Sequence, residues 1–193
     1  MKLLEERILK DGVALNSDVL LVDSFLNHQV DMGLMQEIGR EFARIFAGKG
    51  INKIATIESS GIAPAGQAAL AMGVPLLVMK KSTSSILSEE LLQTPVASFT
   101  KGSTYQLTTK RKYLSKGDSV LFIDDFLANG EAALGAARLI ESAGATVAGI
   151  GIVIEKAFQP GRLRLIEAGY HPVSLAAVSH METGIISFVE SVS

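Results

Sequence analysis

One stretch, residues 117–144, constrains the fold more than any other part of the chain. Its uncharged run at 120–123 is β-branched or large and apolar, which predicts a buried, central strand. Two adjacent carboxylates, Asp124 and Asp125, are predicted to end that strand. A short loop containing Gly130 then leads into a helical pattern that occupies the rest of the stretch. This order of strand, acidic pair, tight loop and helix predicts a ligand site.

The physical chemistry of this loop favours a phosphorylated sugar. The first turn of a helix presents unpaired N–H groups and the positive end of the helix dipole, both of which suit phosphate. Gly130 permits positive φ and a close approach of the backbone to an anion. Asp124 and Asp125 would repel a phosphate, so we expect them to face sugar hydroxyls or a cation. A solvated strand end followed by an ordinary turn remains the alternative on spacing alone.

The motif resembles one known family. Residues 123–132 read Ile-Asp-Asp-Phe-Leu-Ala-Asn-Gly-Glu-Ala, which is similar to the phosphoribosyl-diphosphate-binding motif of type I phosphoribosyltransferases, above all the bacterial xanthine-specific ones. The resemblance extends over essentially the whole chain, including residues 1–8 and 99–105. Many members carry Thr where this chain has Asn129, and Thr or Ser where it has Ala132. Backbone N–H groups should therefore carry more of the phosphate binding here.

The remaining pattern predicts one α/β domain spanning residues 1–193. Apolar strands alternate with helices, which indicates an open, mostly parallel sheet flanked by helices on both faces. The pattern predicts one helix at residues 3–10 and another that Asp31 caps at its N-terminus. It predicts an extended segment at residues 15–22. The resemblance implies the type I phosphoribosyltransferase fold, with residues 1–30 contributing to a base-binding hood.

Residues 82–112 form a long excursion between core strands. Long loops in compact domains tend to be lids or binding loops, and the resemblance implies a flexible hood loop that closes over the reaction. Alternation around residues 98–107 allows a hairpin. The plainer interpretation is a surface hairpin that helps to form a dimer, and both interpretations are compatible.

A second loop, Ser59-Ser60-Gly61, follows an apolar strand at 54–57 and precedes another helix. On sequence alone an ordinary turn of small residues is as good an interpretation as an anion site. The resemblance assigns these three residues to the diphosphate group. Of the two lysines that follow the strand at 76–79, it favours Lys81 for the same role.

The resemblance implies transfer of the phosphoribosyl group of 5-phospho-α-D-ribose 1-diphosphate to xanthine, giving xanthosine 5′-monophosphate and diphosphate in purine salvage. The implied catalytic residues are Asp124 and Asp125. Mg²⁺ is the implied cofactor, held mainly by the substrate near these carboxylates, with no protein ligand assigned directly. The implied phosphate-binding residues are Ala128, Asn129, Gly130, Glu131 and Ala132.

For the base, the resemblance implies Leu20, Asn27 and Lys156. The chemistry fits an oxopurine, because Lys156 can donate to a 6-oxo group whereas an adenine amino group would leave it unpaired. The Asn27 amide can donate to a 2-oxo group or accept from a 2-amino group. A guanine- or hypoxanthine-preferring enzyme therefore remains an alternative to a xanthine-specific one.

Composition excludes several other classes. A net charge of −2 gives no electrostatic case for binding nucleic acid or an anionic membrane, and the absence of cysteine excludes disulfides and thiolate zinc sites. The N-terminus lacks a signal-peptide pattern, so we expect a cytoplasmic enzyme with small-molecule substrates. A homodimer is implied by the resemblance only. Two rivals are a non-catalytic, purine-sensing regulator of the same fold and an unrelated nucleotide-binding enzyme, although neither G-x-G-x-x-G nor a Walker lysine motif is present.

Overall fold

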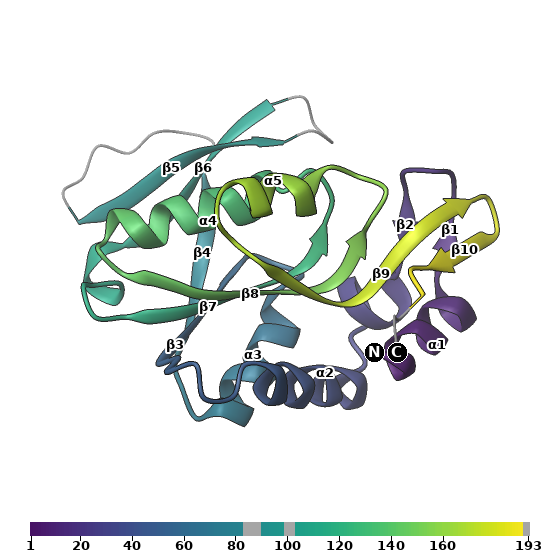
Figure 1. Cartoon of the computed structure of the whole chain (residues 1–193), viewed down its shortest axis with the longest axis horizontal. Coiled ribbons are helices and arrows are strands. Elements are labelled where there is room, and N and C mark those ends of the chain that lie inside the picture. Colours follow the sequence, from purple (N-terminus) through teal and green to yellow (C-terminus); the bar gives the residue numbers. More distant parts are fainter. Residues whose placement is uncertain (83–89, 99–102, 191–193) are drawn as a thin grey trace.

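The computed structural model describes residues 1–82, 90–98 and 103–190 (Figure 1). Within these ranges the main sheet has eight strands, in the order β10-β9-β8-β7-β3-β4-β6-β5. Neighbours from β9 to β4 run parallel, whereas β10, β6 and β5 are antiparallel additions at the two edges. The strands are β3 (Lys53–Ile57), β4 (Leu76–Ser82), β5 (Leu91–Ser98), β6 (Ser103–Lys110), β7 (Ser119–Leu127), β8 (Thr146–Lys156), β9 (Pro172–Glu182) and β10 (Ile185–Phe188). The prediction of an open, mostly parallel sheet is confirmed.

Helices cover both faces of this sheet (Figure 1). On one face lie α2 and α3, and on the other lie α4 and α5 with the β5–β6 hairpin beyond α4. The helical elements are α1 (Lys2–Asp11), the π-helix η1 (Asp23–Asn27), α2 (Met32–Ile45), α3 (Ile62–Met72), the 3-10 turn η2 (Arg111–Tyr113), α4 (Glu131–Ser142) and α5 (Gly161–Glu167). Among the helices of the described residues, none combines the length and the apolar character that crossing a membrane requires.

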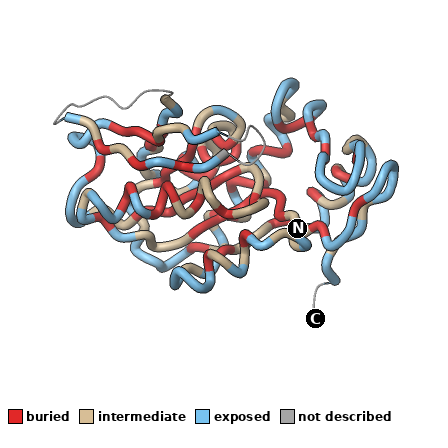
Figure 2. Tube along the Cα trace, turned by 90° about the horizontal axis from the view of Figure 1, so that it is seen from above, coloured by how far each residue is buried: buried red, intermediate tan, exposed pale blue. Residues whose placement is uncertain are grey.

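Successive side chains of the central strand β7 point alternately into the two halves of the core. Leu121 and Ile123 belong to the cluster packed under α2 and α3, while Val120 and Phe122 belong to the cluster packed under α4. All four side chains are fully buried. Figure 2 shows the buried residues concentrated along the centre of the sheet. An uncharged strand buried on both faces is what the apolar run predicted.

A glycine lets α2 and α3 approach very closely. A Cβ added to Gly39 of α2 would lie 2.5 Å from the backbone carbon of Gln67 in α3. Such a contact with backbone has no flexible side chain that can yield. By contrast, a Cβ added to Gly66 of α3 would find its nearest neighbour, a methyl of Leu76, at 3.9 Å.

We expect Gly39→Ala to lower the free energy of unfolding by about 1–3 kcal/mol, because the added methyl must separate two packed helices. Gly66→Ala is the matched control, since it makes the same change inside a helix where space exists. It should be neutral or stabilising by up to about 1 kcal/mol through helix propensity. Urea denaturation of both variants measures the difference, and equal effects at the two positions would contradict the packing described here.

The acidic pair does not end its strand, and that prediction was wrong. The strand β7 continues through Asp124 and Asp125 to Leu127, because Phe126 and Leu127 still pair with Ile154 and Glu155 of β8. The following helix begins at Glu131, just before the predicted apolar periodicity starts. Lys80 and Lys81 do not end their strand either, because β4 continues beyond them to Ser82.

The N-terminal segment is less extended than predicted. Only β1 (Val13–Ala14) and β2 (Leu20–Leu21) form strands, and these two pair with each other in a small separate sheet. The π-helix η1 follows and buries the side chains of Phe25 and Leu26. This burial explains why residues 23–27 mix apolar with polar side chains. The predicted helices at 3–10 and after Asp31 are confirmed, and the Asp31 carboxylate accepts the cap bond from Leu34 N at 3.1 Å.

Much of the excursion at 82–112 is a hairpin that extends the main sheet. Strand β5 pairs with β6, and β6 pairs with β4 through Lys81 and Leu107. Residues 83–89 and 99–102 lie outside the described residues, and with them most of the segment at 99–105 that carried the resemblance. Flexibility of this hood stays a prediction.

Candidate active site

The phosphate loop, residues 128–132, joins β7 to α4 at the carboxyl end of the central strand. Gly130 caps α4 with φ of 82°, a left-handed conformation that favours glycine. The loop borders a hollow of about 190 Å³, which Lys81, Tyr105 and Phe126 also line. The sequence prediction of a glycine-containing loop at a helix N-terminus is therefore confirmed.

The acidic pair precedes this loop and is not a solvated strand end. Asp124 is only 7% exposed, and its Oδ1 accepts a hydrogen bond from Asp125 N at 3.1 Å. Burial, with the adjacent Asp125 carboxylate, raises the pKa of Asp124 well above its ordinary value. Burial also raises the pKa of Asp125. Among the described residues neither carboxylate forms an ion pair, so the pair would gain from a cation or hydroxyl donors.

The second predicted loop meets the first across neighbouring parallel strands. Ser59, Ser60 and Gly61 lead from β3 into α3, after a cis peptide bond at Glu58-Ser59. A Cβ on Gly61 would lie 3.2 Å from Asp124 Oδ1, so the N-terminus of α3 and the buried carboxylate adjoin. Two helix N-termini therefore flank the acidic pair, as the rule for ligand sites in open α/β sheets predicts.

The two lysines of β4 have different surroundings. Lys80 Nζ pairs with Glu58 Oε2 at 2.9 Å, and Lys81 N donates to Glu58 Oε1 at 2.8 Å. These contacts, with that to Lys80 first, lower the pKa of Glu58. The Lys81 ammonium forms no ion pair within the described ranges and lies 5.6 Å from the centre of the Tyr105 ring. Lys81 is thus the freer cation beside the phosphate loop.

The residues predicted for the base are only partly brought together. Lys156 ends β8, its ammonium donates to the Asp18 carbonyl, and it lies 5.7 Å from the centre of the Phe126 ring. Burial lowers the pKa of Lys156. Leu20 is buried and lies two residues beyond Asp18 in the chain. Asn27 is exposed on η1, and no contact joins it to Lys156 in the described part of the chain.

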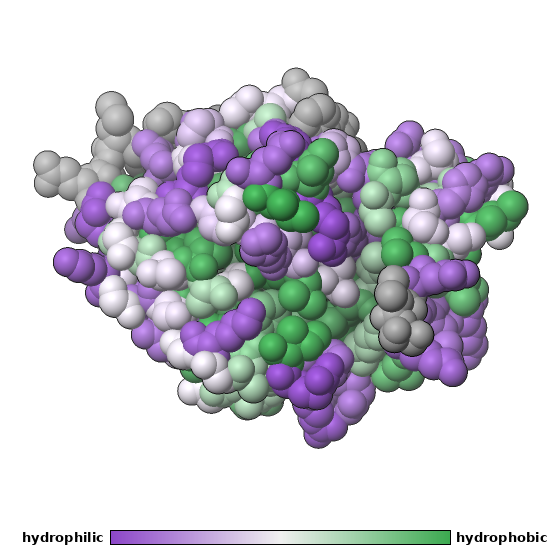
Figure 3. Space-filling view, in the orientation of Figure 1, coloured by the Kyte–Doolittle hydropathy of each residue, from purple (hydrophilic) through white to green (hydrophobic). Residues whose placement is uncertain are grey.

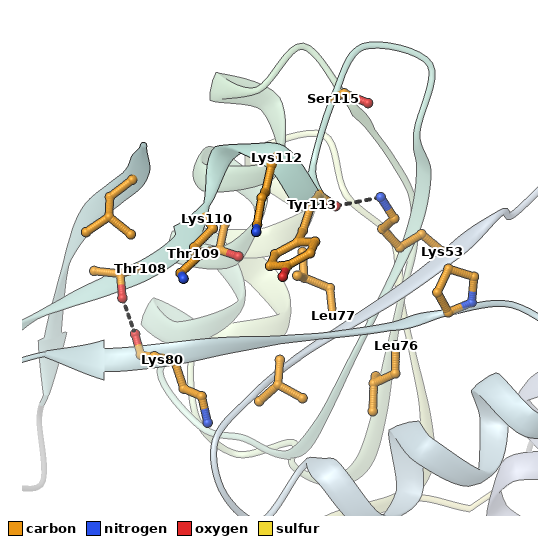
Figure 4. A pocket seen from close by; sticks show the side chains of 13 residues that line it. Lys53, Leu76, Leu77, Lys80, Thr108, Thr109, Lys110, Lys112, Tyr113 and Ser115 are labelled. Atoms are coloured by element: carbon orange, nitrogen blue, oxygen red, sulfur yellow. Dashed lines mark hydrogen bonds between the residues drawn. The ribbon is translucent and has the colours of Figure 1, made fainter. Parts of the chain in front are cut away.

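A larger hollow of about 690 Å³ lies away from these residues, between β4, β6 and the turn after β6 (Figure 4). Its lining includes Lys53, Lys110, Lys112 and Tyr113 around apolar side chains of β4. Lys53 is already engaged by Asp118 at 2.7 Å and by the Tyr113 carbonyl at 2.6 Å. Since no predicted site residue lines it, size alone does not locate the candidate active site.

Comparison with known proteins decides the family. A model of the phosphoribosyl transferase domain matches residues 29–167, which is well over half of the chain. The chain belongs to the phosphoribosyltransferase family.

Individual relatives agree with this assignment. Xanthine phosphoribosyltransferase 1 of Clostridium botulinum strain Hall is 56% identical, covering 98% of this chain and 100% of the relative. The xanthine phosphoribosyltransferase of Exiguobacterium sp. is 54% identical, covering 100% of both. Among solved structures, adenine phosphoribosyltransferases from Thermoanaerobacter pseudethanolicus and Giardia lamblia superpose with TM-scores of 0.76 and 0.77. They share 24% and 19% identity, cover 90% and 92% of this chain and 99% and 98% of their own, and show the common fold.

Two aromatic residues of this phosphoribosyltransferase line the hollow of the candidate site, and sequence reasoning did not single them out. Phe126 lies inside the motif, and its ring faces the Lys156 ammonium, so an aromatic directly after the acidic pair was the available signal. Tyr105 comes from β6 and lines the hollow beside the phosphate loop. Burial, with the charges of Asp124 and Glu131, raises the pKa of the Tyr105 phenol to about 12. Its hydroxyl therefore stays protonated at neutral pH and remains a donor.

Proposed function

We propose that this chain is a xanthine phosphoribosyltransferase of purine salvage. It transfers the phosphoribosyl group of phosphoribosyl diphosphate to xanthine, giving xanthosine 5′-monophosphate and diphosphate. The observation that carries the proposal is the grouping at one sheet edge of a buried acidic pair, the phosphate loop and the N-terminus of α3. Relatives named xanthine phosphoribosyltransferase at 52–58% identity support the choice of base.

Different residues of the site bind different parts of phosphoribosyl diphosphate. N–H groups of residues 128–132 hold the 5-phosphate, and Asp124 and Asp125 hold the ribose hydroxyls. The loop at 59–61 and the Lys81 ammonium hold the diphosphate as it leaves. Because negative charge grows on the diphosphate while the sugar becomes oxocarbenium-like, donors fixed in advance around the leaving group lower the barrier. Closure of the hood would exclude water, which otherwise hydrolyses the reactive sugar.

The donor set fits Mg²⁺ held mainly by the substrate. Magnesium sites typically use one or two carboxylates together with substrate phosphates and waters. Asp124 and Asp125 offer two carboxylates without an ion-pair partner, and within the described residues no group of three potential ligands gathers to form a protein cage. When bound, Mg²⁺ would neutralise charge on the diphosphate. The two aspartates would hold it through the ribose hydroxyls or directly.

Lys156 is proposed to donate a hydrogen bond to the 6-oxo group of the base. Its ammonium donates to a backbone carbonyl, that of Asp18. A purine oxo group is an acceptor of the same kind and can replace that carbonyl. Leu20 and Phe126 are apolar neighbours suited to the purine faces, and Asn27 is proposed to contact the 2-position.

We expect Lys156→Met to raise the KM for xanthine about 10- to 100-fold, because it removes a charged hydrogen-bond donor. The KM for phosphoribosyl diphosphate should change less than about threefold, since its phosphate loop is intact. Steady-state kinetics with each substrate varied in turn measures both values. Equal rises in the two KM values would show that the lysine does not act on the base.

The deciding experiment measures diphosphate release from phosphoribosyl diphosphate and Mg²⁺ with xanthine, guanine, hypoxanthine, adenine or orotate supplied separately. Turnover should be strongest with xanthine. Preference for guanine or hypoxanthine would keep the reaction but overturn the role given to Asn27. Binding of phosphoribosyl diphosphate without turnover on any base would favour a purine-sensing regulator instead.

The remaining proposals concern the setting of the enzyme. We propose a cytoplasmic homodimer with small-molecule substrates and without nucleic-acid or membrane partners. The net charge of −2 supports the absence of polyanionic partners. Analytical ultracentrifugation tests the dimer, and a single species with the mass of one chain would contradict it.

A further inference from the structure

Helix α5 contacts the phosphate loop without intervening side chains. Gly161 N, at the start of α5, donates to the Ala128 carbonyl at 2.9 Å. A Cβ on Gly161 would lie 2.2 Å from that oxygen, and one on Gly130 would lie 3.1 Å from the Gly161 Cα. The two glycines therefore face each other. The loop and the first turn of α5 fit together backbone to backbone.

Arg164, one turn further along α5, forms two hydrogen bonds with the loop. Its Nη1 donates to the Asn129 carbonyl at 2.6 Å, and its Nη2 pairs with Glu131 Oε1 at 2.5 Å. The Glu131 carboxylate is negatively charged and the Asn129 carbonyl oxygen is the negative end of a peptide dipole, so both would repel an anion bound at the loop. A guanidinium that engages both is well suited to hold them away from a phosphate, because its fork of donors is rigid.

All three carbonyl groups at the start of the loop are occupied by partners within the protein. The Ala128 carbonyl accepts from Gly161 N and the Gly130 carbonyl from Leu134 N, both at 2.9 Å. Only the middle carbonyl, that of Asn129, depends on a side chain, Arg164. The N–H groups of Asn129 and Gly130 donate to no acceptor in the described part of the chain. The loop thus offers its donors while its acceptors are engaged.

This arrangement matters more because the loop lacks hydroxyl groups at Asn129 and Ala132. Backbone N–H groups can bind an anion only if the peptide planes keep their orientation. The seven-residue helix α5 buries only Gly161 and Leu165, and its Leu163 is 60% exposed. Figure 3 shows apolar residues interspersed with polar ones on the face of the molecule viewed there. The burial of α5 therefore fixes the loop weakly, and the contacts of Arg164 add the missing constraint.

We propose that Arg164 is a positioning residue that orients the phosphate loop for the 5-phosphate without touching the substrate. The assignment of that phosphate rests on the proposed function. Arg164 keeps the Asn129 peptide plane turned and neutralises Glu131, so the loop presents N–H groups rather than negative charge to the anion.

Calorimetric binding of two simple ligands tests this role. Ribose 5-phosphate occupies the phosphate loop, whereas inorganic pyrophosphate with Mg²⁺ occupies the other loop at 59–61. We expect Arg164→Gln to weaken ribose 5-phosphate binding about 10- to 100-fold and pyrophosphate binding less than about threefold. Arg164→Lys keeps the charge but loses the fork, and should fall between Arg164→Gln and the unaltered protein. Arg44→Gln, which breaks an ion pair with Glu41 on the other face of the sheet, is the matched control and should change neither affinity.

Equal weakening of both ligands, or unchanged affinity for ribose 5-phosphate, would overturn the positioning role. Steady-state kinetics gives an independent readout, because loss of positioning should raise the KM for phosphoribosyl diphosphate while leaving the KM for xanthine nearly unchanged. The two proposals fail separately. If the unaltered protein turns over no base, the proposed function fails, yet selective loss of ribose 5-phosphate binding in Arg164→Gln would still support the inference.

Discussion

Asp124→Asn is expected to lower kcat/KM for phosphoribosyl transfer by about 10²- to 10³-fold while making the fold more stable at neutral pH. The loss of activity follows from removing a preorganised charge beside the reacting sugar. The gain in stability follows from the position of the carboxylate, which is 7% exposed and adjoins Asp125. An amide of the same shape carries no charge to bury.

The pH dependence of stability follows from the same raised pKa. In the unfolded chain Asp124 titrates near its ordinary value of 3.8, and in the folded protein it titrates at higher pH. Between those two values the folded state holds the extra proton, so the free energy of unfolding falls as pH rises through this window. In Asp124→Asn this contribution to the fall should disappear. Thermal unfolding from pH 4 to pH 8, with and without the substitution, measures it.

An Asp124→Asn variant that keeps full turnover would remove the residue from the catalytic machinery. Asp118→Asn is a useful control, because Asp118 lies just before the start of β7 and is paired with Lys53 at 2.7 Å. Its pKa is lowered by the hydrogen bonds from Lys53 and from Ser115 N, which outweigh the cost of burial. That substitution should therefore destabilise the fold and leave the chemistry unchanged.

Arg162→Met is expected to lower the free energy of unfolding by about 3–5 kcal/mol. The Glu155 carboxylate is 1% exposed and is held by Arg162 through two bonds, Nε to Oε1 at 2.7 Å and Nη2 to Oε2 at 2.5 Å. Ser174 also donates to this carboxylate. Removing the arginine leaves a buried charge without its cation, which costs far more than the net contribution of the ion pair.

A double-substitution cycle separates that cost from the packing of the arginine stem. Glu155→Gln combined with Arg162→Met should recover a large part of the stability, because the uncompensated charge is gone. Urea unfolding with a constant m-value is the measurement. A single variant within about 1 kcal/mol of the unaltered protein would show that the carboxylate finds another partner or water.

Local sequence pattern was enough to predict the layered fold and the glycine-containing loop at the N-terminus of α4. The apolar run at 120–123 and Gly130 are signals that lie within a few residues of each other. The end of β7 was not predictable in this way, because Asp124 and Asp125 remain in the strand only through pairing with β8, which is more than twenty residues away. Hydrogen bonds to a neighbouring strand override the local preference of the aspartates for a strand end.

The supporting residues of the site were harder to find for the same reason. Gly161 and Arg164 lie at an unremarkable helix start, and only the folded chain brings them against residues 128–131. The π-helix η1 is a rare element whose two buried residues fit no common period. Conversely, the role proposed for Asn27 came from the resemblance, and the structure leaves that side chain exposed.

The small two-stranded sheet and η1 have a bearing on how base preference can change over evolution. The match to the phosphoribosyl transferase domain begins at residue 29, so residues 1–28, including Leu20 and Asn27, precede the matched range. This segment is packed into the domain, because Leu4, Ile8, Phe25 and Leu26 belong to the core cluster under α2 and α3. It is also bonded to the rest of the chain through Asp18 to Lys156, Arg7 to Asp31 and Leu15 to Thr183. A change of base preference through this segment would therefore alter part of the hydrophobic core together with Leu20 and Asn27, which are proposed to contact the base. Chimaeras joined near residue 29 would let an experimenter follow the same route.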